Sequence, residues 1–485
     1  MKIHHLFIIL LFVIWQPTIA QNQNNNWCFG DKAGLTFPNG NPQAFTSSQM
    51  TSIEGCASVS DPVSGNLLFY SNGLQVWDAN NNVMPNGNGL LGGPTTSSTQ
   101  GVFITPYPGK AKLYYLFTLD ETINGGANGF RYSVVDMGLN NGLGDVISSQ
   151  KNILIQTNTT ERIAATTNAN GTGYWILTHE RNNNCFKAYS ITASGFNAQP
   201  VNTNIGSVHS TTPLTNGDGT MGYMKFSPDG KRLAVAMYAA NLVEWFDFDN
   251  ASGSLSNAIS ISTLDNPYGL EFSPDNSKLY YTMYYNAGFN GAVYQLDLSA
   301  TNPSPQLVGL SSSINNQCMG ALQLAPDNKI YISINSESWL SAIAQPNNVG
   351  ISCGFVDKAI LLPNVGLFPT KGILGLPPKV LDIARNAVDT SNNYCFLYFP
   401  NAFTPNGDGK NDKFSITANC QVEHFEFLIF NKWGELIYKT NNQKDQWDGK
   451  YLGLDCPNGV YIYLSKYNFF KQPQKEQNGP LMLLR

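Results

Sequence analysis

Short runs in which apolar and polar residues alternate dominate this chain of 485 residues, and turns rich in Asn, Gly, Pro and Asp separate them. Six segments repeat one pattern, a polar turn followed by a short strand rich in Tyr, Leu and Ile: 60–70, 106–115, 168–176, 227–235, 273–281 and 325–332. Pro-Asp-Gly and Pro-Asp-Asn form tight turns because Gly and Asn tolerate positive φ. The alternation that follows each turn indicates a half-buried strand.

The first residues of successive segments lie 46 to 62 positions apart, a length that fits four short strands. A unit of this size is one blade of a β-propeller, and blades bury their faces by packing around an axis. The last three segments resemble the Ser-Pro-Asp-Gly strands of seven-bladed propellers of the WD40-like and surface-layer-protein-like kind. A seventh blade would form if the strand at 27–30 paired with the region 372–380. We therefore predict an all-β chain with a seven-bladed propeller over residues 21–385, and six blades are the alternative.

The first 20 residues have the features of a secretory signal peptide. Lys2 supplies a positive charge, residues 6–15 form an apolar core, and residues 18–20 offer a site for signal peptidase. This core is too short to span a bilayer as a helix. A buried N-terminal helix is the alternative, but the polar amide residues that follow argue against it. We expect the mature chain to begin at Gln21 after export.

Charged residues make up only 13% of the chain, and Asn, Gly, Ser and Thr supply most of the polar surface. This usage suits β-sheets with tight turns and disfavours long helices. Without Lys2 the mature part carries 27 basic and 33 acidic residues (28 − 1 against 33), and no basic patch stands out. We therefore expect no nucleic-acid partner.

All eight cysteines lie in the mature part, where export permits disulfides. We predict a disulfide between Cys420 and Cys456, because both flank one predicted small domain, and name Cys318 with Cys353 as a second candidate pair. No Cys/His group has the spacing of a zinc site, so we expect no structural metal.

The chain changes character near residues 377–393, where two prolines and a polar run interrupt the strands. We predict a linker at 386–394 and a separate domain over 395–485. That domain reads as a strand, a long Asn/Asp/Gly turn, an alternating strand, a Trp-Gly turn and further strands. Pieces of this kind over about 90 residues predict a small immunoglobulin-like β-sandwich.

The motifs of this module resemble, in order and spacing, the gliding motility-associated C-terminal domain, the type B sorting domain of the type IX secretion system of Bacteroidetes. The match covers essentially the whole module, and Lys432 stands where the family often has Arg. The resemblance rests on Pro400, Asn401, Phe403, Thr404, Pro405, Asn406, Gly407, Asp408, Gly409, Asn411, Asp412, Phe430, Asn431, Trp433, Gly434, Trp447, Asp448, Gly449, Gly459, Tyr461 and Arg485.

The resemblance implies how the protein travels. The signal peptide would take the chain to the periplasm, and the type IX translocon with its shuttle proteins would then recognise the C-terminal domain. The protein would end secreted or held at the cell surface. Family members are often linked to outer-membrane barrel partners, which this sequence alone does not show.

The loop at 406–412 also raises the question of a calcium site, because Asp408, Asn411 and Asp412 offer hard oxygen ligands. The loop lacks the twelve-residue spacing and terminal Glu of an EF-hand. The alternative is an Asx-rich turn whose side chains bond their own backbone. We favour the turn and expect no cofactor.

Candidate catalytic residues are few. The mature chain has three histidines, and His179 and His209 could line the mouth of the propeller, although a structural role is favoured for each; the third is His424. Glycosidases need only two carboxylates, so Asp120, Glu121, Glu161 and Glu180 stay open as candidates. We expect Trp433 and Trp447 to pack inside the C-terminal domain.

Two functional hypotheses follow. The first is a non-enzymatic surface protein that binds a glycan or protein ligand, as an adhesin or an accessory of the gliding or secretion machinery. The second is a propeller enzyme acting on glycans. We expect the first, because histidines are scarce and no paired-acid motif appears. Two carboxylates close together in a central cleft would favour the second.

Overall fold

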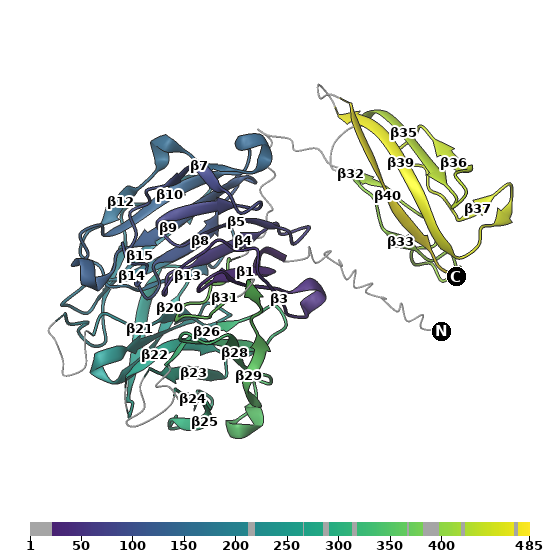
Figure 1. Ribbon diagram of the computed structural model, residues 1–485. Helices are drawn as coiled ribbons and strands as arrows, with labels where there is room; N and C mark the ends of the chain where they lie inside the picture. Colours follow the sequence, from purple (N-terminus) through teal and green to yellow (C-terminus); the bar gives the residue numbers. More distant parts are fainter. Residues whose placement is uncertain are drawn as a thin grey trace, which may run out of the picture. The chain divides into compact units, whose positions relative to one another are not determined.

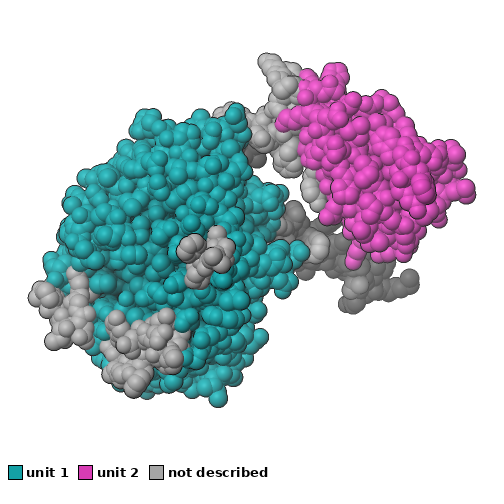
Figure 2. All heavy atoms as spheres, viewed as in Figure 1, with its two compact units in different colours: residues 1–387 teal, residues 388–485 magenta. Residues whose placement is uncertain are grey.

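The computed structural model describes residues 22–211, 219–264, 266–284, 291–312, 318–365, 368–381, 397–418, 422–469 and 474–485. The chain divides into two compact units, unit 1 (residues 1–387) and unit 2 (residues 388–485), as Figure 2 shows. The predicted signal peptide (1–20) and linker (386–394) lie outside the described residues. Among the described residues no helix is long and apolar enough to cross a membrane.

Unit 1 contains six consecutive antiparallel sheets of four or five strands (Figure 1). The first two consist of β4 (Ala57–Ser60), β5 (Leu67–Ser71), β6 (Gln75–Asp78) and β7 (Val83–Asn88), then β8 (Val102–Pro106), β9 (Leu113–Leu119), β10 (Phe130–Asp136), β11 (Asp145–Val146) and β12 (Ile153–Gln156). The next two consist of β13 (Ile163–Thr167), β14 (Tyr174–His179), β15 (Cys185–Thr192), β16 (Gly195–Phe196) and β17 (Val201–Asn204), then β18 (Met224–Phe226), β19 (Arg232–Met237), β20 (Leu242–Asp249) and β21 (Ser254–Ser262). The last two consist of β22 (Pro267–Phe272), β23 (Lys278–Met283), β24 (Ala292–Asp297) and β25 (Gln306–Leu310), then β26 (Met319–Leu324), β27 (Ile330–Ile334), β28 (Trp339–Ile343) and β29 (Phe355–Leu361).

Burial falls from the first strand of each sheet to the last. β8 and β22 are buried along their whole length, whereas β21 is mostly exposed. The first strands of neighbouring sheets contact one another, β4 with β8 and β22 with β26 among them. They therefore surround a common axis, which is the arrangement of a propeller.

The two ends of unit 1 complete a seventh blade. β1 (Asn26–Phe29), β2 (Ala33–Thr36) and β3 (Gln43–Phe45) form a three-stranded sheet, with β1 beside β4. Residues 371–381, which we call the strap, run antiparallel to β1: Asp31 and Lys371 pair through their backbones, and Asn24 bonds Val380. The two ends of unit 1 are thus joined on either side of β1, whereas the registered strand partner of residues 26–29 is β2 and not the predicted region 372–380.

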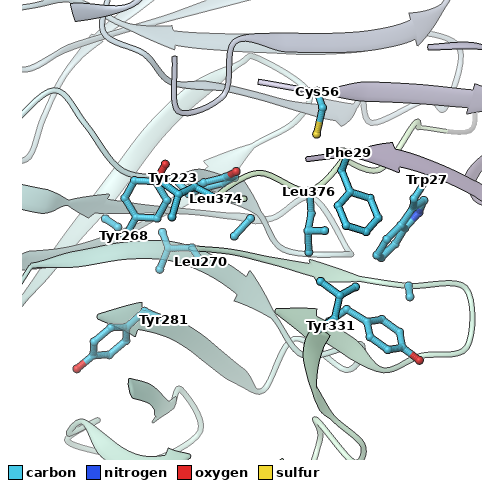
Figure 3. Packing of buried hydrophobic residues seen from close by; sticks show 14 of the residues in the cluster. Trp27, Phe29, Cys56, Tyr223, Tyr268, Leu270, Tyr281, Tyr331, Leu374 and Leu376 are labelled. Atoms are coloured by element: carbon cyan, nitrogen blue, oxygen red, sulfur yellow. The ribbon is translucent and has the colours of Figure 1, made fainter. Parts of the chain in front are cut away.

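The strap fills the centre of the propeller. The amide of Leu374 donates to the carbonyl of Ile53, and the carbonyl of Leu374 accepts from Ala321 of β26. Leu374 and Leu376 belong to the same buried cluster as Phe29 and Tyr223 (Figure 3). The end of the propeller where the first strands begin is called the loop face here, and the opposite end the turn face. The strap passes from the loop face to the turn face.

The predicted tight turns connect the first and second strands of the blades. The hydroxyl of Ser227 donates to Asp229 at 2.6 Å, and Gly230 has φ +67°. Ser273 and Asp275 repeat the first contact at 2.6 Å, and Asn276 takes positive φ. The turn face is marked by these turns, which lie at 61–66, 107–112, 168–173, 227–231, 273–277 and 325–329.

The remaining elements of unit 1 are short. A two-stranded sheet joins β30 (Asn364–Val365) and β31 (Phe368–Pro369). The described residues hold no α-helix and seven single-turn 3-10 helices: η1 (Asn22–Asn24), η2 (Pro38–Gly40), η3 (Thr122–Asn124), η4 (Asn140–Gly142), η5 (Ser148–Gln150), η6 (Tyr238–Ala240) and η7 (Gly350–Cys353).

Unit 2 is a small β-domain. Its main sheet has the order β33 (Ala402–Phe403), β40 (Lys475–Leu483), β39 (Gly459–Phe469), β35 (Val422–Phe430) and β36 (Leu436–Thr440). Two short pairs join β32 (Leu397–Tyr398) to β34 (Thr417–Ala418) and β37 (Lys450–Tyr451) to β38 (Leu454–Asp455). A cluster that includes Phe427, Tyr463 and Trp447 forms its core.

Candidate functional site

Three glutamates are buried at the loop face. Glu54 and Glu161 lie just before the first strands β4 and β13, and Glu121 follows the end of β9. The carboxylate of Glu161 accepts the backbone N–H groups of Thr99 and Thr122, the first at 3.0 Å. Glu121 accepts the hydroxyl of Thr95 at 2.7 Å and the N–H of Ser97 at 3.1 Å. These carboxylates therefore hold the chain that leads into β8.

The third glutamate, Glu54, was missed by the sequence analysis. Burial raises the pKa of Glu54 well above its ordinary value, and the neighbouring charges of Glu161 and Glu121 raise it further. Burial also raises the pKa of Glu161, although the N–H groups of Thr122 and Thr99 oppose the shift. The available signal was position, because Glu54 and Glu161 each lie within three residues of the first strand that follows, β4 and β13.

This acidic centre has the charge pattern of an acid catalyst but not its access. A carboxyl group with a raised pKa near a second carboxylate is what glycoside hydrolysis requires. However, Glu54 is only 4% exposed and Glu161 only 2%. The oxygens of Glu161 accept hydrogen bonds from Thr99 and Thr122, and Glu54 Oε2 is buried and makes no hydrogen bond to the described residues.

The other two predicted carboxylates have local partners. Asp120 accepts the N–H of its neighbour Glu121 at 2.9 Å and that of Asn128 at 2.7 Å, and it also accepts from the side chain of Asn124. Glu180 forms an ion pair of 3.0 Å with Lys187. The structure thus joins Glu121 and Glu161 with Glu54, and gives Asp120 and Glu180 local structural partners.

His179 and His209 stack on each other, with ring centroids 3.4 Å apart. Both are fully buried. The guanidinium of Arg162 donates to His209 Nδ1 at 3.0 Å, and because Arg can only donate, the His209 proton lies on Nε2. Burial and Arg162 lower the pKa of His179 to about 3, and burial, His179 and Arg162 lower that of His209. The pair is neutral and buried, which fits the structural role that the sequence favoured; His424 is exposed on β35.

A pocket of about 240 Å³ lies on the turn face, beside the end of the strap. Its walls come from the ends of β13, β18, β22 and β26, and Lys379 of the strap lies at its edge. The ammonium of Lys225 pairs with Glu271 at 3.1 Å and donates to Gln323 at 2.6 Å. The sequence analysis did not select these three residues, because they come together only where three blades meet.

In unit 2 the loop at 406–412 bonds its own backbone. Asp412 accepts the N–H groups of Gly407 and Gly409 at 2.6 and 2.7 Å, and Asn406 accepts from Asp408 at 3.1 Å. Gly407, Gly409 and Asn411 take positive φ. This is the Asx-rich turn that the sequence analysis favoured over a calcium loop.

Trp447 and Arg485 are the motif residues with the most extensive contacts described in unit 2. Trp447 is 1% exposed, packs on Phe403 and Tyr461, and donates through its indole to the carbonyl of Lys450 at 3.0 Å. Arg485 donates to the carbonyl of Gly449 at 3.0 Å and pairs with Asp455 at 3.1 Å. The other motif residues lie as follows: Pro400, Asn401, Thr404 and Pro405 around β33, Phe430 in β35, Asn431 and Gly434 in the next turn, Asp448 after Trp447, and Gly459 in β39.

Comparison with protein families decides what unit 2 is. Residues 397–483 match the profile of the CHU_C type IX secretion signal domain. The chain carries a type IX secretion signal at its C-terminus. The protein is therefore a substrate of that system and is exported to the cell surface or secreted, as the resemblance in the sequence implied.

The solved structures similar to the chain include the following three, each at 16% identity or less. One is a 6-phosphogluconolactonase-like protein from Bacteroides uniformis (14% identity, 81% of this chain and 96% of that chain, TM-score 0.40). A periplasmic gluconolactonase from Pseudomonas aeruginosa matches at 16% identity over 57% of this chain and 76% of that chain (TM-score 0.37), and the Dos1 propeller at 10% over 62% and 71% (TM-score 0.32). Curated proteins gave no match to the chain.

One packing prediction for the secretion signal domain is wrong. Trp433 is 82% exposed, and the ammonium of Lys432 lies 5.0 Å from its ring centroid. The reason is local: Asn431 accepts the N–H groups of Trp433 and Glu435 at 3.0 Å, and Gly434 has φ +80°. The turn between β35 and β36 therefore holds Trp433 away from the core.

The predicted disulfides are not seen. Cys456 has a free thiol, buried beside Tyr461 and Arg485, and Cys420 lies outside the described residues. The predicted Cys318–Cys353 pair is wrong, because Cys353 is a free thiol that contacts Tyr280, while Cys318 belongs to a different buried cluster.

Proposed function

We propose that this protein is a cell-surface binding protein: the type IX system exports it, and its propeller binds a ligand without converting it. The observation that carries the proposal is the contrast between the two polar sites of unit 1. The acidic centre at the loop face is enclosed, and the polar pocket at the turn face is open beside Lys379.

The use of the acidic centre supports binding over catalysis. A general acid must reach the oxygen that it protonates, within about 3 Å. Glu161 and Glu121 use their carboxylate oxygens to accept backbone N–H groups, and Glu54 is only 4% exposed, with Gly375 of the strap packed against its backbone carbonyl.

The partners follow from the two units. The secretion signal domain would be bound by the type IX translocon and its shuttle proteins during export, and by an outer-membrane barrel if the protein stays attached. The propeller would bind a surface glycan or protein, as an adhesin or an accessory of the gliding or secretion machinery.

The second candidate is a glycan-cleaving propeller, and the raised pKa of both Glu54 and Glu161 is the observation in its favour. The test incubates the purified mature protein with surface polysaccharide and measures both retained glycan and new reducing ends. We expect retention with no new reducing ends. Release of reducing ends that Glu54→Gln or Glu161→Gln abolishes would establish the enzyme instead.

A further inference from the structure

The turn-face pocket has a wall of charged and amide groups that is itself buried. Glu271 is 4% exposed and Gln323 is 2% exposed, and Lys225 joins them. Burying such a group costs several kcal/mol unless its partners satisfy it. Well-packed apolar residues at this position would stabilise the fold as well as the ion pair does. The propeller thus keeps at its axis an ion pair that folding does not require.

Hydrogen-bonding capacity remains on this wall. The Lys225 ammonium has three N–H groups, and two of them go to Glu271 and Gln323. The Gln323 amide gives one N–H to the carbonyl of Leu324. Glu271 Oε1 accepts the N–H of Phe272, and Glu271 Oε2 accepts the N–H of Leu324 as well as the ammonium of Lys225. One ammonium N–H, one amide N–H and one lone pair of Glu271 Oε1 are thereby left for a ligand.

The charges of Lys225 and Glu271 cancel inside the pocket, which disfavours an ion bound between them, and Lys379 lies at the edge of the pocket. The carboxylate of Glu271 lies 3.1 Å from the ammonium of Lys225, so it would repel an anion bound to Lys225. A cation bound to Glu271 would in turn be repelled by Lys225. A hydroxyl group both donates and accepts, so adjacent hydroxyls can bridge a carboxylate and an ammonium. Phe103, Ile163 and Leu324 add apolar surface to the lining, and we call these three residues the apolar wall.

The size of the pocket restricts the ligand further. Its volume of about 240 Å³ is slightly below the roughly 300–1,000 Å³ of most small-molecule sites. It therefore admits one ring and not a length of polymer.

We propose that this pocket binds a single neutral sugar ring, with Lys225, Glu271 and Gln323 bonding its hydroxyls and the apolar wall covering one face. The inference rests on the proposed binding function and names its ligand class. The ring is either a free monosaccharide or the terminal unit of a surface glycan, which present the same hydroxyls.

The test titrates the full mature protein by calorimetry with three kinds of probe: neutral hexoses, short glycans ending in them, and two ionic controls, inorganic phosphate and glycine. Saturable binding of a hexose or of a hexose-ended glycan supports the inference, and the tighter of the two identifies the source. Binding of phosphate or glycine without binding of any sugar would overturn the inference of a sugar ligand, and the proposed binding function would still stand. Binding of no probe overturns the inference, and cleavage of a glycan overturns the proposed function as well.

The variants separate recognition from folding. Lys225→Met alone would leave Glu271 buried without its partner, so the informative protein is the double variant Lys225→Met/Glu271→Gln, which keeps size and neutrality. We expect it to melt cooperatively and bind at least about tenfold more weakly, since charge-assisted bonds are lost. The matched control is Lys278→Met, which breaks the 3.1 Å ion pair with Asp297 in the same blade as Glu271 but outside the pocket. Full affinity in the folded double variant would contradict the proposal.

Discussion

The guanidinium of Arg485, the last residue, donates a hydrogen bond of 3.0 Å to the carbonyl of Gly449, 36 positions earlier in the chain. The same side chain donates to the carbonyl of Cys456 and pairs with Asp455. The end of β40 is thus tied to the segment that follows the buried Trp447, within the secretion signal domain.

Replacing Arg485 tests whether these hydrogen bonds stabilise unit 2. We expect Arg485→Ala to lower the free energy of unfolding of unit 2 by about 1–2 kcal/mol, because charge-assisted bonds to two carbonyls and a carboxylate are lost. Arg485→Lys should recover only part of the lost stability, because the lysine ammonium lacks the planar, forked set of N–H groups with which a guanidinium reaches several acceptors. Urea unfolding of the full chain, followed by proteolysis within unit 2, measures both. An unchanged midpoint for Arg485→Ala would contradict the role.

The two tryptophans of the secretion signal domain should differ sharply. Trp447→Ala empties the core and should cost about 3–5 kcal/mol, whereas Trp433→Ala changes an exposed side chain and should stay within about 0.5 kcal/mol. Thermal unfolding of the two variants checks this. Equal losses would mean that Trp433 packs after all.

The strap makes unit 1 depend on its last residues. Leu376→Ala should lower the free energy of unfolding by about 2–5 kcal/mol, because Leu376 is 3% exposed at the centre of the ring. The exposed neighbour Lys379 provides the control, and Lys379→Ala should have little effect. We further expect a chain that ends at residue 381 to melt cooperatively without unit 2, and one that ends at 370 not to. Cooperative melting of the shorter chain would show that the strap is dispensable.

The histidine pair predicts a loss of stability in acid. The folded pKa of His179 is about 3, below the roughly 6.5 of an unfolded chain, so its contribution is complete above pH 6.5 and is lost as pH falls toward 3. The slope is about 1.4 kcal/mol per pH unit for each histidine. Glu54 and Glu161, with raised pKa values, act in the opposite direction.

The measurement compares the unfolding free energy of wild type and His179→Gln between pH 6.5 and 4. The variant has one fewer buried histidine to protonate, so its curve should be flatter whatever its absolute stability. Parallel curves for the two proteins would show that His179 does not titrate with unfolding.

The secretion signal should act on its own. We predict that residues 395–485 direct a fused periplasmic passenger to the surface of a type IX-competent host, and that the same fusion carrying Trp447→Ala does so poorly because the domain unfolds. Protease accessibility of the passenger on intact cells reports the outcome. A wild-type fusion that stays in the periplasm would refute the prediction.

Local signals made the propeller and its turns predictable. Ser227 and Asp229 specify their turn within three residues, and the same contact at Ser273 and Asp275 gives the blade spacing. The exposure of Trp433 was not predictable from its motif, because it depends on where the β35–β36 turn points. The predicted Cys318–Cys353 disulfide was wrong for a similar reason. The two cysteines belong to different buried clusters, and their separation in the sequence does not reveal this.

The polar sites depended on contacts between distant segments. Glu54 joins Glu161 across more than 100 positions, and Lys225 meets Gln323 across 98. Neither pair has a local motif, because each forms only when blades close around the strap. The sequence therefore predicted candidate acids but could not distinguish an enclosed centre from an open pocket.

The most direct test of the account is a pull-down of the mature protein from the outer membrane of its own cells, with mass spectrometry and glycan analysis of what co-purifies. The account predicts an intact sugar-bearing ligand that the Lys225→Met/Glu271→Gln variant fails to retain. Recovery of shortened glycan products, or of translocon subunits with no propeller ligand at all, would contradict it.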